Sequence, residues 1–389
     1  MKKQVVVASL AEERAAGRVL RKLSFAPAGQ PPSVVYWDIS GPEEGLPTAL
    51  RTADLAAVSL IFYCMRRGAP LHVEGTVTKK LLQDLEEFQD IWTHWRSDLY
   101  SKVPVSADDE IEQSAYPHEA RKGFGICAFS GGVDGTATAW RHYTNKAGRA
   151  SRKLRAGVLI RGFDLPLDNA VAWEASKASA VVALDDIGVP FVTLETNWRD
   201  ICGDWEMEFG AGAIACLRNW EPDADSLLLG SCEDYARLVT PWGSHPLPTR
   251  LLGGDLAVAY DGGAMSRTEK VALLSEWPAG YHSLRVCWQG DITGTNCGVC
   301  EKCVRTKLNA IACGAELPRS LGERPTAEQI SRITISNPVQ LILMEEIIQE
   351  SAERKIDDPL ILALKRKLQR DRQLAPLKGV KRKLVSMLR

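Results

Sequence analysis

The sequence predicts an α/β protein built on a parallel five-stranded sheet, and two observations carry that prediction. From Gly123 onward, short apolar runs alternate with helical patterns, which is typical of a parallel sheet with helical crossovers. Turn-forming Gly, Ser, Asp and Asn residues follow these runs, and open parallel sheets bind ligands at the carboxyl ends of their strands. The five expected strands are 125–129, 157–161, 191–194, 226–229 and 256–260.

Length, composition and charge exclude several classes. The 389 residues are 45% hydrophobic and 25% charged, as in an ordinary globular protein, and a net charge of −1 gives no overall attraction to nucleic acid or membranes. No apolar run reaches the roughly 18 residues of a spanning helix, and the apolar stretch after Lys3 is too short for a signal peptide. We therefore expect a cytoplasmic protein whose ten cysteines serve metal binding or catalysis.

The residues before the predicted sheet, 1–115, are interpreted as a small N-terminal α/β module. Its expected elements are a strand at 34–39, a helix at 47–67, a strand at 71–77 and a helix at 79–95. No pattern in this module points to chemistry, so its role stays open between shaping a substrate site and mediating dimerisation. The polar segment 106–122 is the expected linker to the domain at 120–318.

The first predicted strand of that domain leads directly into the sequence S-G-G-V-D-G-T at 130–136, and a helical pattern follows. In a strand–turn–helix of this kind, free backbone amides and the helix dipole favour an anion, and glycines let a phosphate approach closely. Neither the Gly-Lys-Ser/Thr of kinase-type P-loops nor G-x-G-x-x-G is present. The turn predicts a phosphate site, and the structural alternative is a tight turn without a ligand.

A second motif lies later in the chain, where four cysteines follow the spacing C-x9-C-x2-C-x2-C: Cys287, Cys297, Cys300 and Cys303. Four thiolates at this spacing can surround one tetrahedral Zn²⁺, although a four-iron cluster also uses four cysteines. Three closely spaced cysteines with a more distant fourth suit a closed structural site. We therefore expect zinc rather than a cluster.

The turn at 130–136 resembles the S-G-G-x-D-S/T loop of the PP-loop ATP pyrophosphatase family, whose members cleave ATP to AMP and pyrophosphate. The resemblance implies a Rossmann-like PP-loop sheet, with pyrophosphate held at Ser130, Gly131 and Gly132. It also implies that Asp134 binds Mg²⁺ or aligns the phosphates. The family's hydroxyl after the aspartate is Gly135 here, which leaves Thr136 as the nearest donor.

Together with the late cysteines, this loop resembles the 7-cyano-7-deazaguanine synthases, zinc-containing PP-loop enzymes that use ATP and ammonia to turn a ring carboxylate into a nitrile. The segment 266–273 resembles their T-K-A-E-x-x-A-L segment, which implies that Arg267 is a catalytic cation near the nucleotide. The same resemblance assigns four more residues to nucleotide binding: Gly162, Asp164, Gly230 and Ser231.

One departure limits what is carried over, because the family's Tyr-Pro-Asp-Cys substrate segment is missing. Residues 238–248 stand in its place, where Trp242, Ser244 and His245 can bind a different substrate. The expected function is therefore adenylation of a carboxylate or amide oxygen of a small molecule, with ATP and Mg²⁺. Ammonia or an amine then displaces AMP, and the substrate is not assigned.

Two alternatives stay open. Other PP-loop enzymes insert sulfur into small molecules or tRNA, and Cys232 is the best-placed sulfur carrier. A degenerate loop with Gly135 can also bind a nucleotide without catalysis.

The final segment, 319–389, is an expected basic helical extension with helices at 338–355 and 359–372. A homodimer, and contact of this tail with tRNA or an anionic surface, are further hypotheses.

Overall fold

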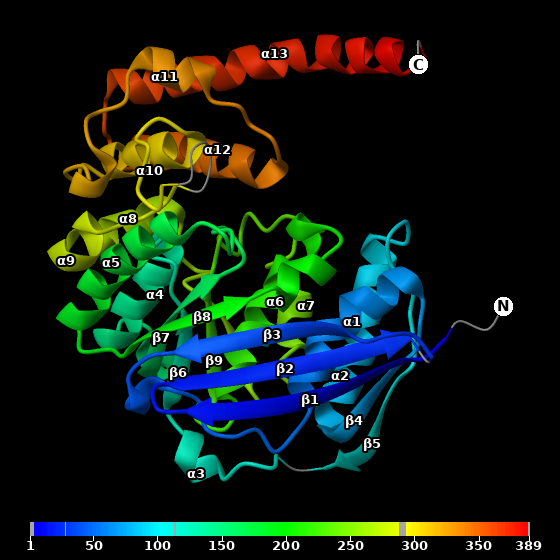
Figure 1. Ribbon diagram of the computed structural model, residues 1–389. Helices are drawn as coiled ribbons and strands as arrows, with labels where there is room; N and C mark the ends of the chain where they lie inside the picture. The colour runs from blue at the N-terminus through cyan, green and yellow to red at the C-terminus, as the bar shows by residue number, and fades with distance from the viewer. Residues whose placement is uncertain (1–3, 28, 113, 288–292, 388–389) are drawn as a thin grey trace.

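The computed structural model describes residues 4–27, 29–112, 114–287 and 293–387. Its centre is one mixed sheet of ten strands in the order β10-β9-β6-β7-β8-β3-β2-β1-β4-β5 (Figure 1). The α/β prediction is confirmed, but the prediction of a five-stranded sheet was wrong, because strands of the N-terminal residues extend the same sheet. The five expected strands are neighbours and mutually parallel. They are β6 (Phe124–Ala128), β7 (Lys153–Arg161), β8 (Phe191–Thr196), β9 (Ser226–Gly230) and β10 (Ala257–Asp261).

The N-terminal half begins with an antiparallel meander of three strands, two of which the sequence did not predict. These are β1 (Val6–Ala15), β2 (Arg18–Pro27) and β3 (Ser33–Ser40). Strand β3 then pairs antiparallel with β8, and this pairing makes the sheet continuous. On the other side of β1 lie β4 (Leu71–Thr78) and β5 (Val105–Ile111), both parallel to it in direction. The expected linker at 106–122 therefore contains most of β5 and the short α3 (His118–Arg121).

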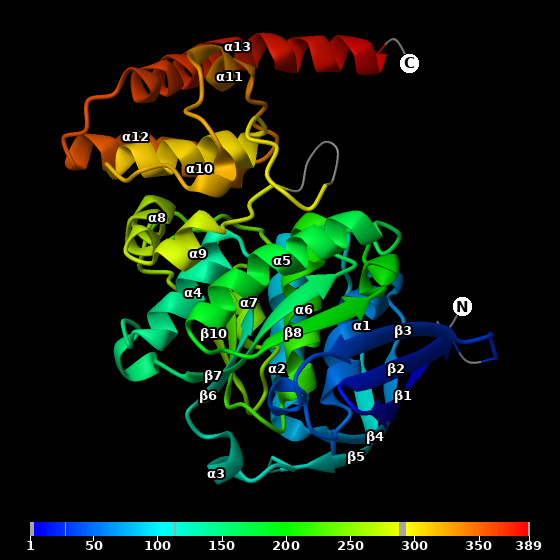
Figure 2. The ribbon, with the colours of Figure 1, turned by 60° about the vertical axis from the view of Figure 1, so that its left-hand side comes forward.

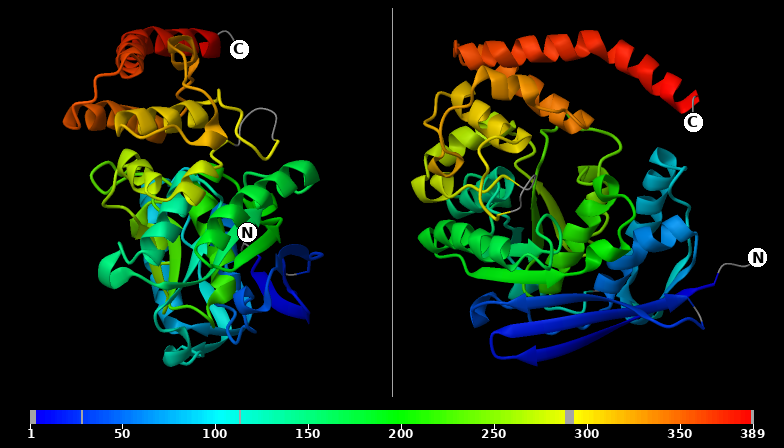
Figure 3. Two further views of the ribbon diagram at one scale, coloured as in Figure 1. Left: turned by 90° about the vertical axis from the view of Figure 1, so that its left-hand side faces the viewer. Right: turned by 45° about the horizontal axis from the view of Figure 1, so that its top comes forward.

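Helices cover the two faces of the sheet and bury two apolar cores. One face carries α1 (Asp54–Arg67), α2 (Lys79–Trp95), α6 (Trp205–Leu217) and α7 (Pro246–Arg250). The other face of the parallel half carries α4 (Val133–Tyr143), α5 (Ala170–Asp186), α8 (Arg267–Ser275) and α9 (Pro278–His282). The two views in Figure 3 show both layers edge-on.

The C-terminal residues form a helical layer with its own apolar core. Its helices are α10 (Glu301–Ala312), α11 (Ala327–Arg332), α12 (Pro338–Glu353) and α13 (Pro359–Met387). In Figures 1 and 2, α10 and α12 lie next to α8, and α11 and α13 lie outermost. The extension is helical, as expected, but its inner helices are packed against the parallel half rather than projecting as a tail.

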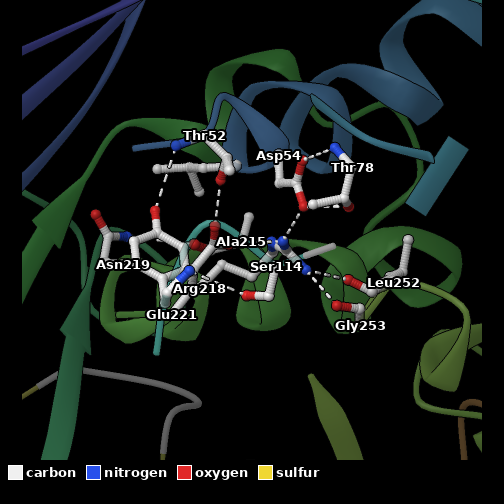
Figure 4. A network of polar contacts seen from close by, with 12 residues as sticks. Thr52, Asp54, Thr78, Ser114, Ala215, Arg218, Asn219, Glu221, Leu252 and Gly253 are labelled. Atoms are coloured by element: carbon white, nitrogen blue, oxygen red, sulfur yellow. Dashed lines mark hydrogen bonds and ion pairs between the residues drawn. The ribbon is translucent and has the colours of Figure 1, made fainter. Parts of the chain in front are cut away.

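A buried polar network joins the two halves of the sheet (Figure 4). Arg218, only 1% exposed, donates to the carbonyls of Leu252 and Gly253 at 2.9 and 2.8 Å. Its other terminal nitrogen contacts Asp54 at 2.9 Å and Glu221 at 2.6 Å. Since Asp54 begins α1 and also accepts hydrogen bonds from Thr78, the network ties the N-terminal helices to the parallel half of the sheet.

Short capping motifs set the start of the helices that carry site residues. Ser266 and Glu269 form a capping box, in which each side chain accepts from the other's backbone amide at 3.0 and 2.7 Å. The box fixes Arg267 at the first residue of α8. Asn337 is the N-cap of α12 and makes a single capping bond, in which its side chain accepts from the amide of Gln340 at 3.0 Å.

Candidate functional site

A cavity of about 480 Å³ lies at the carboxyl ends of the central parallel strands. Ala128 ends β6, Ile160 lies near the end of β7, and Gly230 ends β9, and all three line the cavity. This is the position at which open parallel sheets bind ligands, and the volume is that of a small-molecule site. A smaller cavity of about 90 Å³ adjoins it and shares Ser130, Asp134 and Asp164 with it.

Two glycines allow the predicted phosphate turn to lie directly on the strand ends. A Cβ atom on Gly135 would stand 2.7 Å from the carbonyl oxygen of Ala128, and one on Gly230 would stand 2.7 Å from the carbonyl of Asp134. Gly131 has a φ of +74°, in the left-handed region that glycine adopts without strain. Gly135 thus has a steric role: the hydroxyl residue that the resemblance led us to expect does not fit this backbone.

The carboxylate of Asp134 is held by two cations from α8. Arg267 Nη1 donates to Asp134 Oδ2 at 2.9 Å, and Lys270 Nζ lies 3.6 Å from Oδ1. Burial acts to lower the pKa of Arg267, but the surrounding acidic groups, of which Asp134 contributes most, together outweigh burial and the pKa is raised. Lys270 also donates to the carbonyl and hydroxyl oxygens of Ser231, both at 2.6 Å. The structure therefore brings Asp134 and Arg267 together at the cavity wall.

Three further cations line the cavity, and the sequence analysis missed all of them: Arg285, Lys302 and Arg305. The backbone amide of Arg285 donates to the carbonyl of Gly131 at 2.8 Å, and its Nη2 donates to the carbonyl of Ser130 at 3.1 Å. Arg285 and Arg305 are 6% and 3% exposed. A signal was present in the sequence, because each of these basic residues lies within two positions of a cysteine of the second motif.

Several guanidinium nitrogens in this wall have no hydrogen-bond partner among the described residues. They are Nε of Arg267, Nε of Arg285 and Nη1 of Arg305. The Nε atoms of four arginines that line neither cavity are unpaired as well: Arg121, Arg155, Arg161 and Arg218. The unpaired atoms alone therefore do not indicate a ligand, but those at the cavity are donors for one that supplies acceptors. Phosphate and carboxylate oxygens are the acceptors whose geometry arginine matches.

The four predicted cysteines meet beside this cationic wall, so that part of the prediction is confirmed. The Sγ atoms of Cys287, Cys297, Cys300 and Cys303 all lie within 4.8 Å of one another. The Cys287 sulfur lies 3.5 Å from that of Cys297 and 3.5 Å from that of Cys300. Four thiolates this close can hold a metal ion such as zinc. Cys287 also lines the smaller cavity, next to Gly132 and Ser130.

The far end of the larger cavity is apolar and aromatic. Four rings that line it form a chain of contacts: Phe163 with Trp205 at 5.1 Å, Trp205 with Phe209 at 6.0 Å, and Phe209 with Trp242 at 6.2 Å between centroids. Val339 and Leu343 of α12 complete this end. The cavity thus has a cationic end suited to phosphates and an aromatic end suited to a flat or apolar group.

Of the other predicted site residues, some line a cavity and others are buried behind its wall. Asp164 lines both cavities, and Gly230 lines the larger one. Gly162 lies behind them, where an added Cβ would stand 1.8 Å from the carbonyl oxygen of Thr196. Thr136 and Ser231 are 1% and 0% exposed, and neither is among the described residues that line a cavity.

Two residues considered for other chemistry also have clear positions. Cys232 lines the larger cavity, but burial raises the pKa of its thiol to about 12. It is therefore a neutral thiol near pH 7, whereas a sulfur carrier needs a thiolate. His245 accepts from the amide of Leu247 at 3.2 Å and contacts the ring of Trp95, so it caps α7 outside the cavity lining.

Comparison of the chain with family models, curated proteins and solved structures finds no match. The family resemblance therefore stays a prediction. Among the described residues, no helix combines the length and apolar character that crossing a bilayer requires.

Proposed function

We propose that the protein is an ATP-dependent, AMP-forming ligase that adenylates a carboxylate or amide oxygen of a small molecule. Ammonia or an amine then attacks the activated molecule and displaces AMP. The observation that carries this proposal is the set of basic side chains that line one cavity together with the S-G-G turn at the strand ends: Arg267, Arg285, Lys302 and Arg305. That cluster matches a polyphosphate better than it matches an uncharged ligand.

In the proposed reaction, the acceptor oxygen attacks the α-phosphorus of ATP while the bond from that phosphorus to the pyrophosphate oxygen breaks. Negative charge accumulates on the departing pyrophosphate, so cations fixed around it lower the barrier. Arg267, Arg285 and Lys302 supply those charges, and the turn at Ser130 supplies backbone amides. The amine then attacks the activated carbon, and AMP leaves with the oxygen.

A magnesium ion held by carboxylates at the same end of the cavity would supply positive charge to the departing pyrophosphate. Asp134 and Asp164 both line the two cavities, which makes them the carboxylates best placed to hold it. Oδ1 of Asp134 is buried and accepts no hydrogen bond from the described residues, although Lys270 Nζ lies 3.6 Å from it, so this oxygen can still accept from a metal-bound water.

For the four cysteines we propose zinc in a structural role. One Zn²⁺ lies about 2.3 Å from each sulfur, which places the sulfurs about 3.8 Å apart and agrees with the compact cluster. A four-iron cluster binds each cysteine through a different iron, so it needs its sulfurs farther apart. Four thiolates fill a tetrahedral ion, so the metal keeps no open position for substrate.

The decisive test is product analysis with labelled ATP and a metabolite extract, comparing wild type with Asp134→Ala. We expect wild type to form AMP and pyrophosphate in equal amounts, together with a new amide found by mass spectrometry. Asp134→Ala should form neither product, and Asp185→Ala, which removes an exposed carboxylate outside the cavity lining, should match wild type. Nucleotide binding without any pyrophosphate release would identify a binding module instead of an enzyme.

A further inference from the structure

The metal cluster and the phosphate turn are joined by one short segment. Arg285 lies two residues before Cys287, and its backbone amide and its side chain both donate to carbonyls of the turn, at Gly131 and Ser130. An added Cβ on Gly131 would stand 3.6 Å from the Cβ of Arg285, so the two backbones run in contact. Any displacement of Cys287 is therefore transmitted to the turn.

A second segment connects the cluster to the same cavities. Lys302 lies between Cys300 and Cys303 at the start of α10, and it lines both cavities. Arg305 follows one turn later and lines the larger cavity. The two halves of the cysteine motif thus each carry a cation to the proposed phosphate end.

Asn296 holds the first segment next to Cys297. Its Oδ1 accepts from the amides of Val286 and Cys287 at 2.8 and 3.2 Å, and its Nδ2 donates to the carbonyl of Leu284 at 2.7 Å. Asn296 immediately precedes Cys297. Its side-chain amide therefore holds Cys297 next to Cys287 from outside the sulfur cluster, as the metal does from inside it. The position of Arg285 relative to Lys302 then depends on whether the four sulfurs are held together.

We propose that the four-cysteine site and the phosphate end of the cavity are thermodynamically coupled through Arg285 and Lys302. The metal fixes the two cations in the positions that a polyphosphate needs, and a bound polyphosphate in turn holds the metal. This inference rests on the proposed nucleotide function. Coupling between two binding sites is reciprocal at equilibrium and is commonly between about 5-fold and 150-fold.

The test measures zinc release from metal-loaded protein to a colorimetric chelator, with Mg²⁺ and with or without α,β-methylene-ATP, which cannot release pyrophosphate. We expect the nucleotide to slow zinc release at least about fivefold. Inorganic pyrophosphate should act in the same way, and adenosine should have no effect, because the proposed link passes through the phosphate end. Calorimetry should show at least about fivefold weaker nucleotide binding to zinc-stripped protein that keeps its circular dichroism spectrum.

Variants separate this coupling from a general effect on stability. Arg285→Ala should load zinc but release it at one rate with or without nucleotide, whereas Arg319→Ala, an exposed arginine outside both cavities, should behave as wild type. If Arg285→Ala does not load zinc, Lys302→Ala takes its place in the same comparison.

Three outcomes overturn the coupling. Wild type that binds α,β-methylene-ATP but releases zinc at an unchanged rate refutes the coupling and leaves the proposed ligase standing. An Arg285→Ala or Lys302→Ala variant that keeps the full slowing of release refutes that residue as a link. Wild-type, zinc-loaded protein that binds no nucleotide refutes the coupling and the ligase together.

Discussion

Replacing Gly135 tests whether the glycine is a loss of function or a requirement of this fold. If the glycine is a degenerate position, Gly135→Ser restores the hydroxyl of the PP-loop pattern and raises activity. The structure predicts the opposite, because the new Cβ would stand 2.7 Å from the backbone oxygen of Ala128. Neither partner in that contact is a flexible side chain, so the start of α4 has to move.

The size of the effect follows from two opposing terms. Forcing an extra carbon into a packed site costs about 1 to 3 kcal/mol, whereas replacing a helical glycine gains at most about 1 kcal/mol. The net loss is then at most about 3 kcal/mol, with about 1 to 2 kcal/mol as the central value. With an unfolding entropy of about 2.1 cal/mol/K per residue over 389 residues, this central value corresponds to a fall in the thermal midpoint of about 1 to 2.5 °C. Movement of the turn also displaces the backbone amides at Ser130 from the phosphates, so pyrophosphate release should fall as well.

The assay pairs differential scanning fluorimetry with pyrophosphate release for Gly135→Ser and Gly135→Ala. Gly132→Ala is the matched control for stability. Its Cβ would meet Ser130 Oγ at 3.2 Å, a group that can rotate, and the carbonyl oxygen of Arg285 at 3.7 Å, an ordinary contact distance, so its thermal midpoint should stay close to wild type. A Gly135→Ser protein with an unchanged midpoint and faster pyrophosphate release would refute the steric reasoning and favour the degenerate-loop interpretation.

Three other outcomes follow from the structure. Cys232→Ala should form the final product at most of the wild-type rate, because burial holds the pKa of the thiol near 12; product formation below about a tenth of wild type, with pyrophosphate release retained, would favour sulfur transfer. Cys297→Ser should lower bound zinc from about one per chain to near zero, measured by atomic absorption, and full retention would contradict the four-sulfur site. Burial raises the pKa of Asp54 to about 6, so the folded chain binds this proton more tightly than the unfolded chain. The contribution of this proton to the free energy of folding is complete below about pH 4 and is lost as the pH rises through about 6. The thermal midpoint of wild type relative to Asp54→Asn should therefore fall over that pH window. A difference in midpoint that does not change with pH would contradict the assignment.

The parallel half of the sheet was predictable because each of its strands is a short apolar run followed by turn residues. Strand β2 was missed for a physical reason. Val19, Leu23 and Phe25 are buried on one face, as alternation requires, but Arg21 lies on the same face with 0% exposure. Its donors reach Asn219 and the carbonyl of Thr48. A charged residue becomes a core residue only through partners that local sequence does not reveal.

Strand β5 was missed for the opposite reason. It is an edge strand with little buried surface, and its acidic residues, including Asp108 and Asp109, have low strand propensity. Its backbone pairing with β4 alone makes it a strand. The same limit applies at the site: the turn and the cysteines follow local patterns, whereas the positions of Arg285, Lys302 and Arg305 depend on tertiary contacts.

The C-terminal helices show most clearly how tertiary position changes a functional interpretation. Helix α12 was predicted as part of a basic tail, yet Val339, Gln340 and Leu343 line the cavity. Asn337, just before it, donates to Glu206 Oε1 of α6 at 3.0 Å. A parallel sheet alone leaves its strand ends open to water, and water would hydrolyse an adenylated acceptor before an amine arrives. In the proposed ligase, α12 therefore closes the aromatic end of the cavity and keeps water away from the adenylated acceptor.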